Sequence, residues 1–166
     1  MKRTGCTAVL LAAIAIPSCQ RAPLTGPPEL RLGRDMCAEC GMIISEDACA
    51  SATLVEREGV REHALFDDIG CMLDYASEHA GSLQTVESFV RDYSERSWAS
   101  SSSSWFLLTD GEHVRTPMAS GIVAFATSSA AQAAQARWGG KVVQEADLPA
   151  ARDAVHRERQ GIGASP

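Results

Sequence analysis

The sequence predicts an α+β fold made of two similar ββαβ units, packed as one small globular body after a flexible tether. Two observations indicate this arrangement. Short strand-like runs and helix-like patterns follow one another in the same order in both halves of the chain. The landmarks also repeat, because Phe125 follows Phe66, and Gly140 follows Gly81, by 59 residues in each case. A duplicated unit produces such an offset.

Residues 1–18 are expected to be a signal segment of the lipoprotein type. Lys2 and Arg3 precede an apolar run that is too short to span a bilayer. A small residue stands directly before Cys19, which resembles the cleavage site of bacterial lipoproteins and indicates a lipidated N-terminus. An ordinary signal peptide is the alternative. We therefore expect an extracytoplasmic protein, anchored by lipid to a membrane and facing the periplasm.

The first ββαβ unit is expected at residues 35–97, after a lipidated tether at 19–34 that is rich in Pro, Gly and Arg. Its expected elements are strands at 49–57 and 60–66 with a turn at Glu58-Gly59, a helix from Asp67-Asp68 to about His79, and a strand at 86–93. Asp67 and Asp68 are helix-capping residues. Ile69, Met72 and Leu73 then recur at helical spacing, which predicts a face buried in the core.

The second ββαβ unit is expected at residues 98–147, followed by a C-terminal helix and tail at 148–166. Its expected elements are strands at 105–109 and 121–126, a helix from Ser128 or Ser129 to Trp138, and a strand at 141–144. Gly139 and Gly140 end that helix. Ser100 to Ser104 reads as a polar linker near the boundary between the units.

The acidic balance of the chain disfavours one class of partner. The net charge is −6, and it becomes more negative when Lys2 and Arg3 leave with the signal segment. Nucleic-acid binding needs basic residues that replace counterions on phosphates. We therefore expect no nucleic-acid partner.

Four of the six cysteines remain in the mature domain, because Cys6 leaves with the signal segment and Cys19 carries lipid. Cysteines outside the cytoplasm commonly pair in disulfides, so two bridges are one interpretation of the four. For Cys49 and Cys71 we favour a structural disulfide or buried thiols over a ligand role, although both remain possible additional thiols at a metal site.

The segment from Met36 to Met42 carries the clearest chemistry. Cys37 and Cys40 are three residues apart, so one turn of backbone directs both sulfurs to one point, and Gly41 offers the freedom that such a turn needs. If the chain is extended after Cys40, then Met42 points to the same side. Thiolates and thioethers together are soft ligands, which favour copper(I).

Three other interpretations of the same cysteines stay open. A zinc site would need Cys49, Cys71 or His63 to join the pair, and zinc does not use methionine. A thiol–disulfide oxidoreductase also uses a Cys-x-x-Cys pair, but its pair opens a helix, and no helix pattern begins at Cys40. A lipoprotein with only structural disulfides is the third interpretation.

These residues resemble the NosL family of lipoprotein copper chaperones, which accompany nitrous oxide reductase. The resemblance rests on the run Met36-Cys37-Ala38-Glu39-Cys40-Gly41-Met42, the helix start at Phe66-Asp67 and the pair Pro117-Met118, and it covers residues from about 35 to 146. Thr116 stands where the family usually has Gly, and Cys49 and Cys71 are additional thiols.

The resemblance implies a function, a ligand set and partners. It implies a non-enzymatic copper(I) chaperone whose ligands are Cys37, Cys40, Met42 and Met118. On its position in a loop alone, Met118 fits a core-filling side chain equally well. The implied partners are nitrous oxide reductase, whose copper centre would receive the metal, and the membrane transporter of its maturation. A membrane-tethered thiol–disulfide oxidoreductase remains the alternative function.

Overall fold

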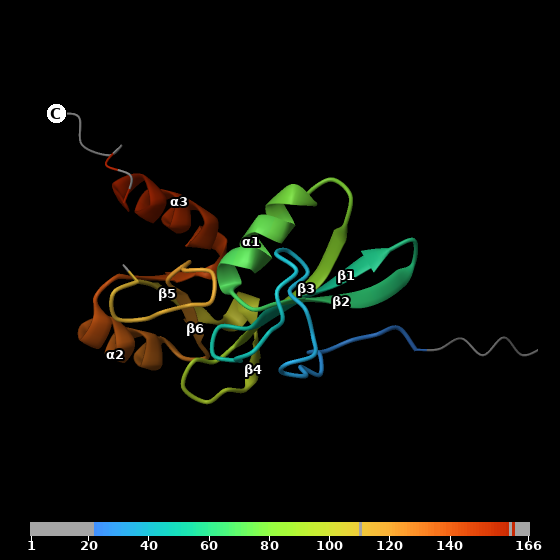
Figure 1. Cartoon of the computed structure of the whole chain (residues 1–166), viewed down its shortest axis with the longest axis horizontal. Helices are drawn as coiled ribbons and strands as arrows, with labels where there is room; N and C mark the ends of the chain where they lie inside the picture. Colours follow the sequence, from blue (N-terminus) through green and yellow to red (C-terminus); the bar gives the residue numbers. More distant parts are fainter. Residues whose placement is uncertain (1–21, 110, 160, 162–166) are drawn as a thin grey trace, which may run out of the picture.

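The computed structural model describes residues 22–109, 111–159 and 161. The expected signal segment, the lipidation site at Cys19 and the end of the predicted tail lie outside the described residues. Among the residues described, none of the helices has the length and apolar character needed to cross a membrane. The predicted α+β fold with two ββαβ units is confirmed (Figure 1).

The first unit contains its strands and helix in the predicted order. Its elements are β1 Ser51–Arg57, β2 Val60–Phe66, α1 Ile69–Glu78 and β3 Gln84–Arg91. The strands pair antiparallel in the order β2-β1-β3. Glu58 and Gly59 both have positive φ, 53° and 79°, which forms the tight turn predicted between β1 and β2. Asp68 caps α1 by accepting a hydrogen bond from the Gly70 N–H.

The second unit repeats this topology. Its elements are β5 Trp105–Leu108, β6 Ile122–Phe125, α2 Ser128–Trp138 and β7 Lys141–Gln144. The strand order β6-β5-β7 is equivalent to β2-β1-β3 in the first unit. Phe66 and Phe125 are each the buried last residue of the second strand, and each lies three residues before the first residue of the helix. The two phenylalanines of the predicted repeat therefore occupy equivalent places.

A third helix covers the face of the second sheet that α2 leaves open, so both faces of this sheet are buried. After the short 3₁₀ turn Glu145–Asp147, α3 runs from Leu148 to Arg159. Alternate residues of β5 face opposite sides, so Phe106 packs in a cluster with Leu148 of α3, whereas Leu107 packs with Ala131 of α2. Figure 1 shows α2 and α3 on opposite sides of β5. The terminal helix predicted from its polar composition thus contributes to the core.

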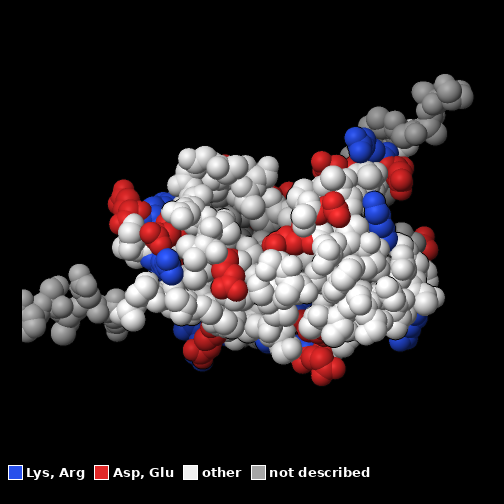
Figure 2. Space-filling model, turned by 180° about the vertical axis from the view of Figure 1, so that it is seen from behind, with Lys and Arg blue, Asp and Glu red and all other residues white. Residues whose placement is uncertain are grey.

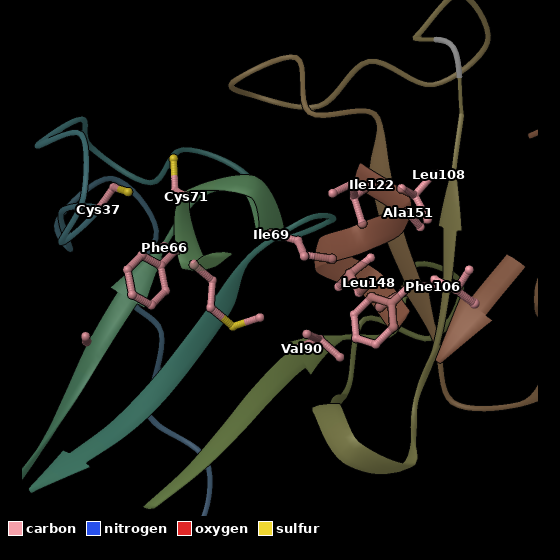
Figure 3. Packing of buried hydrophobic residues seen from close by; sticks show 14 residues of the cluster. Cys37, Phe66, Ile69, Cys71, Val90, Phe106, Leu108, Ile122, Leu148 and Ala151 are labelled. Atoms are coloured by element: carbon pink, nitrogen blue, oxygen red, sulfur yellow. The ribbon is translucent and has the colours of Figure 1, made fainter. Parts of the chain in front are cut away.

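One hydrophobic core joins the two units. Ile69 and Val90 from the first unit lie in the same buried cluster as Phe106 and Ile122 from the second (Figure 3). The backbone continues the connection, because the Tyr93 N–H donates to Ala124 O over 2.8 Å. The units therefore form one small globular body, as predicted.

Two segments differ from the expectation. The predicted linker Ser100 to Ser104 is ordered, because β4, Trp98–Ser100, pairs with β3 and is followed by a 3₁₀ turn, Ser101–Ser103. This strand extends the first sheet beyond residue 97, which was the predicted end of the first unit. The α2 cap is Thr127 rather than Ser128 or Ser129, since the Thr127 backbone is extended and its side chain accepts from the Ala130 N–H.

The later part of the predicted tether contacts the first sheet. Residues 22–30 contain no helix or strand. The His63 Nε2 atom on β2 is nevertheless 2.8 Å from Gly26 O, and Arg31 forms an ion pair with Asp35 at 2.8 Å. The described end of the tether is therefore attached to the folded body.

Charged side chains are interspersed on the surface. On the face shown in Figure 2, basic and acidic residues lie singly or beside one another, and Lys and Arg do not gather into a patch. Ion pairs on the surface include Arg61–Glu56 at 2.7 Å and Arg91–Asp47 at 3.0 Å. Such pairs on a surface contribute little to stability.

Candidate metal centre

The Cys37–Met42 segment forms a tight hairpin rather than an extended strand. The Cys37 N–H donates to Met42 O over 2.8 Å, and the Gly41 N–H donates back to Cys37 O over 2.9 Å. Gly41 has φ of 74°, which a residue with a side chain rarely adopts. The hairpin is fixed to the first sheet because the Ala38 N–H donates to Leu65 O near the end of β2. Local backbone geometry thus holds the cysteine pair at the end of β2.

A third thiol joins this pair. After β2 the chain passes directly into α1, whose third residue is Cys71. The sulfurs of Cys37, Cys40 and Cys71 and a carboxylate oxygen of Asp67 all lie within 4.8 Å of one another. Figure 3 shows Cys37 on the hairpin and Cys71 on α1 in neighbouring positions. We call Cys37, Cys40 and Cys71 the three-thiol cluster.

The cluster is partly shielded from water, and this controls its protonation. Cys37 is 2% exposed and Cys71 is buried, whereas Cys40 is partly accessible. Burial, with a contribution from the Cys40 thiol, raises the pKa of Cys37 to about 11. Burial, followed by the negative charges of Cys37 and Asp67, raises the pKa of Cys71. These thiols therefore keep their protons at neutral pH until a cation displaces them.

Asp67 supplies the polar side of the cluster. The Cys40 Sγ lies 3.9 Å from both carboxylate oxygens of Asp67, as a weak thiol donor would. Asp67 is buried, and the sequence identified it only as a helix-capping residue. The cap is instead formed by Asp68, which leaves the Asp67 carboxylate free to face the thiols.

The four described cysteines, Cys37, Cys40, Cys49 and Cys71, are all free thiols, so the interpretation as two disulfides is wrong for this structure. Cys49 is a buried thiol in the apolar cluster around Phe125, as one sequence interpretation expected. Burial raises the pKa of Cys49 to about 12. Cys71 is a buried thiol as well, as the same interpretation expected, but it also lies beside the Cys37–Cys40 pair, where a ligand role is open to it.

The two methionines predicted as ligands have different positions. Met118 lines a pocket of about 250 Å³ together with Cys40 and Cys71, and it is 44% exposed. Met42 is 52% exposed and is not among the residues that line this pocket. The expected extended chain after Cys40 is interrupted at Gly41, whose φ of 74° turns the backbone before Met42. The ligand roles of both methionines stay predictions.

Helix α3 forms the other wall of this pocket, which we call the metal pocket. Arg152 of α3 makes a bidentate ion pair with Asp74 of α1, with distances of 2.6 and 2.8 Å. His156 also lines the pocket, one turn further along α3. The sequence pattern did not place Arg152 near the cysteines, because Arg152 reaches this pocket through its ion pair with Asp74, 78 positions away in the chain.

The donor set fits a thiophilic cation. Three thiols and one carboxylate suit zinc(II) as well as copper(I), so the addition of Cys71 makes the zinc interpretation stronger than the sequence suggested. His63 does not contribute, since its ring bonds to Gly26 O. The thioether of Met118 at the same pocket favours the softer cation, because zinc sites do not use methionine.

Comparisons with known proteins agree with this description. The family model of NosL matches residues 31–152 of the chain. The crystal structure of the copper chaperone NosL from Shewanella denitrificans is similar, with a TM-score of 0.54 and 17% sequence identity, and the match covers 73% of this chain and 96% of that chain. At this identity the likeness shows the fold alone. A comparison with curated proteins found no match.

Proposed function

Because the chain belongs to the NosL family, we propose that it is a copper(I) chaperone and not an enzyme. The observation that carries the proposal is the convergence of Cys37, Cys40 and Cys71 within 4.8 Å, beside a pocket that Met118 also lines. Soft sulfur donors favour copper(I) over hard cations. The name of the similar Shewanella protein supports the same cargo.

The accessibility of the site suits a carrier. Cys37 is buried behind the metal pocket, whereas Cys40 and Cys71 line it and Met118 is partly exposed. A cation therefore reaches the thiols from one side. Because the pKa of Cys37 is raised to about 11, binding copper(I) displaces its thiol proton, and acid favours release.

The alternative of a thiol–disulfide oxidoreductase fits less well. Such enzymes use an accessible cysteine with a lowered pKa, commonly at a helix N-terminus. Here Cys37 is 2% exposed, its pKa is raised by burial, and residues 37–43 form a turn instead of a helix. The third thiol, Cys71, is also not needed for a two-cysteine redox cycle.

The proposal extends to destination and location. We propose that Cys19 carries the lipid anchor, that the folded body faces the periplasm, and that nitrous oxide reductase receives the copper with help from its membrane transporter. The sequence of the signal segment and the resemblance to the family support these assignments. Transfer from the copper-loaded protein to copper-free reductase, measured as copper bound by the reductase, tests the recipient.

The cargo is tested by titrating the reduced protein with copper(I) against a competing chelator. Cys49 is the matched control for Cys71, because both are buried free thiols and only Cys71 belongs to the three-thiol cluster. Cys40→Ala and Cys71→Ala should weaken binding, and Cys49→Ala should not. Unchanged affinity in both cluster variants, or stronger binding of zinc(II) than of copper(I) by the wild type, would overturn the proposal.

A further inference from the structure

A single buried carboxylate connects the two halves of the metal pocket. Asp68 is 0% exposed, and its two oxygens bind different segments. Oδ1 accepts from the Gly70 N–H over 2.7 Å and caps α1, the helix that carries Cys71. Oδ2 accepts from the Met118 N–H over 2.9 Å, across 50 residues of sequence. The same side chain therefore joins the start of α1, the helix that carries Cys71, to the backbone of the loop that carries Met118.

The loop that carries Met118 is ordered around this bond. Thr116 Oγ1 accepts from the Gly121 N–H over 3.2 Å and lies 3.3 Å from the Ser120 hydroxyl. Ser120 Oγ also accepts from the Ile122 N–H at the start of β6. Internal hydrogen bonds thus stiffen the loop, and Asp68 fixes its position against α1.

The contact between this loop and α1 leaves no spare room. A Cβ atom added to Gly70 would lie 2.7 Å from the Ser120 Cβ. Gly70, Ser120 and Met118 all line the metal pocket. The backbone of α1 and the loop are therefore in direct contact where the two units meet at the pocket.

We propose that Asp68 is a positioning residue that holds Met118 at the metal pocket, so that the thioether joins the three-thiol cluster in binding the cation. This inference rests on the proposed function. Neither the motif nor the family resemblance assigns this role to Asp68. A hydrogen bond to a buried carboxyl group is suited to it, because water does not compete for the bond.

Asp92 offers a matched control. It is 3% exposed, its Oδ1 accepts from the Ser94 and Glu95 N–H groups, and its Oδ2 accepts from the Ala126 N–H over 2.6 Å. Asp92 thus also ties a local cap in the first unit to the backbone of the second. It does not line the metal pocket.

The test replaces each aspartate by serine in the full chain. Serine retains a hydroxyl that caps the local N–H groups but is too short to reach the second segment. Asp68→Ser should lower copper(I) affinity by about tenfold, as loss of a supporting hydrogen bond does at metal sites. Asp92→Ser should leave the affinity unchanged. The methyl resonance of Met118 should shift on copper(I) binding in the wild type and in Asp92→Ser, but not in Asp68→Ser.

A double variant distinguishes positioning from general destabilisation. In a Met118→Leu background, Asp68→Ser should cause no further loss of affinity. An equal loss in that background would overturn the inference, as would wild-type affinity in Asp68→Ser. If Asp68→Ser does not fold, Met118→Leu and the wild type decide. Unchanged affinity in Met118→Leu, together with a Met118 methyl resonance that does not shift when the wild type binds copper(I), would overturn the inference. The proposed function would survive that result if Cys40→Ala and Cys71→Ala still weaken binding.

Discussion

Replacing Gly70 by alanine is expected to destabilise the protein, although alanine is the better helix former. In an unobstructed helix, alanine would stabilise by about 0.5–1 kcal/mol relative to glycine. At Gly70 the added Cβ would lie 2.7 Å from the Ser120 Cβ and 3.1 Å from Asp68 Oδ1. Carbon atoms in contact prefer roughly 3.5–4 Å, so the loop must move by about 1 Å.

The magnitude follows from these two opposing effects. Overpacking of this kind costs about 1–3 kcal/mol, which exceeds the gain in helix propensity. The expected net loss in the free energy of unfolding is about 1–2 kcal/mol, or a fall in Tm of about 3–6 °C for a domain of this size. Thermal and urea unfolding measured by circular dichroism would detect it.

Gly81→Ala is the control, because a Cβ at Gly81 has no atom within 4 Å. Its effect should stay within about 0.5 kcal/mol. The double variant Gly70→Ala with Ser120→Gly removes the clashing Cβ and should recover part of the loss beyond the cost of Ser120→Gly alone. If Gly70→Ala were as stable as the wild type or more so, the close packing of this loop on α1 would be refuted.

Three further predictions concern the thiols, the helices and the core. Because burial raises the pKa of Cys37 to about 11, its thiolate fraction is small at neutral pH, so peptide mass spectrometry of the native metal-free protein should detect slow alkylation of Cys37 that accelerates as pH rises toward 11. Fast alkylation of Cys37 at pH 7 would instead favour an oxidoreductase. Asp74→Asn should break the bidentate ion pair with Arg152 and speed hydrogen exchange in α3. Because Asp74 is half-exposed, the free energy of unfolding should fall by no more than about 1 kcal/mol. Unchanged hydrogen exchange in α3 would contradict the ion pair. Phe66→Ala should lower the free energy of unfolding by about 3–5 kcal/mol in urea titrations because the ring is fully buried, and a loss below about 1 kcal/mol would contradict its place in the core.

The regular elements were predictable because their signals are local. The turn at Glu58-Gly59, the cap before α1 and the glycines after α2 each depend on neighbouring residues, so strand and helix order follows from the chain itself. The serine run was misread for the same reason. Its composition is that of a linker, but Ser101 and Ser104 are buried, and the 3₁₀ turn Ser101–Ser103 contacts β3; composition does not encode these contacts.

The candidate site was only half predictable. The Cys37–Cys40 pair is visible because both thiols lie in one short segment. Cys71 lies off the apolar stripe of α1, and periodicity alone could not show that the motif hairpin packs beside it. The expectation that Met42 shares a side with Cys40 assumed an extended chain, whereas Gly41 has a positive φ of 74°; the ligand role of Met42 stays a prediction. The Met118 N–H bonds to Asp68, a contact across 50 residues that no local pattern predicts.

The three-thiol cluster has a consequence for how fast the protein is degraded. Cys40 and Cys71 are 31 residues apart in sequence and meet only in the folded chain. A peptide cut from residues 35–43 would therefore be a much poorer ligand than the intact domain. Because the cluster exists only in the folded state, bound metal would stabilise that state against unfolding. A protease that cleaves the unfolded chain would therefore degrade the metal-bound protein more slowly than the metal-free protein. Proteolysis would then remove the metal-free form before the metal-bound form.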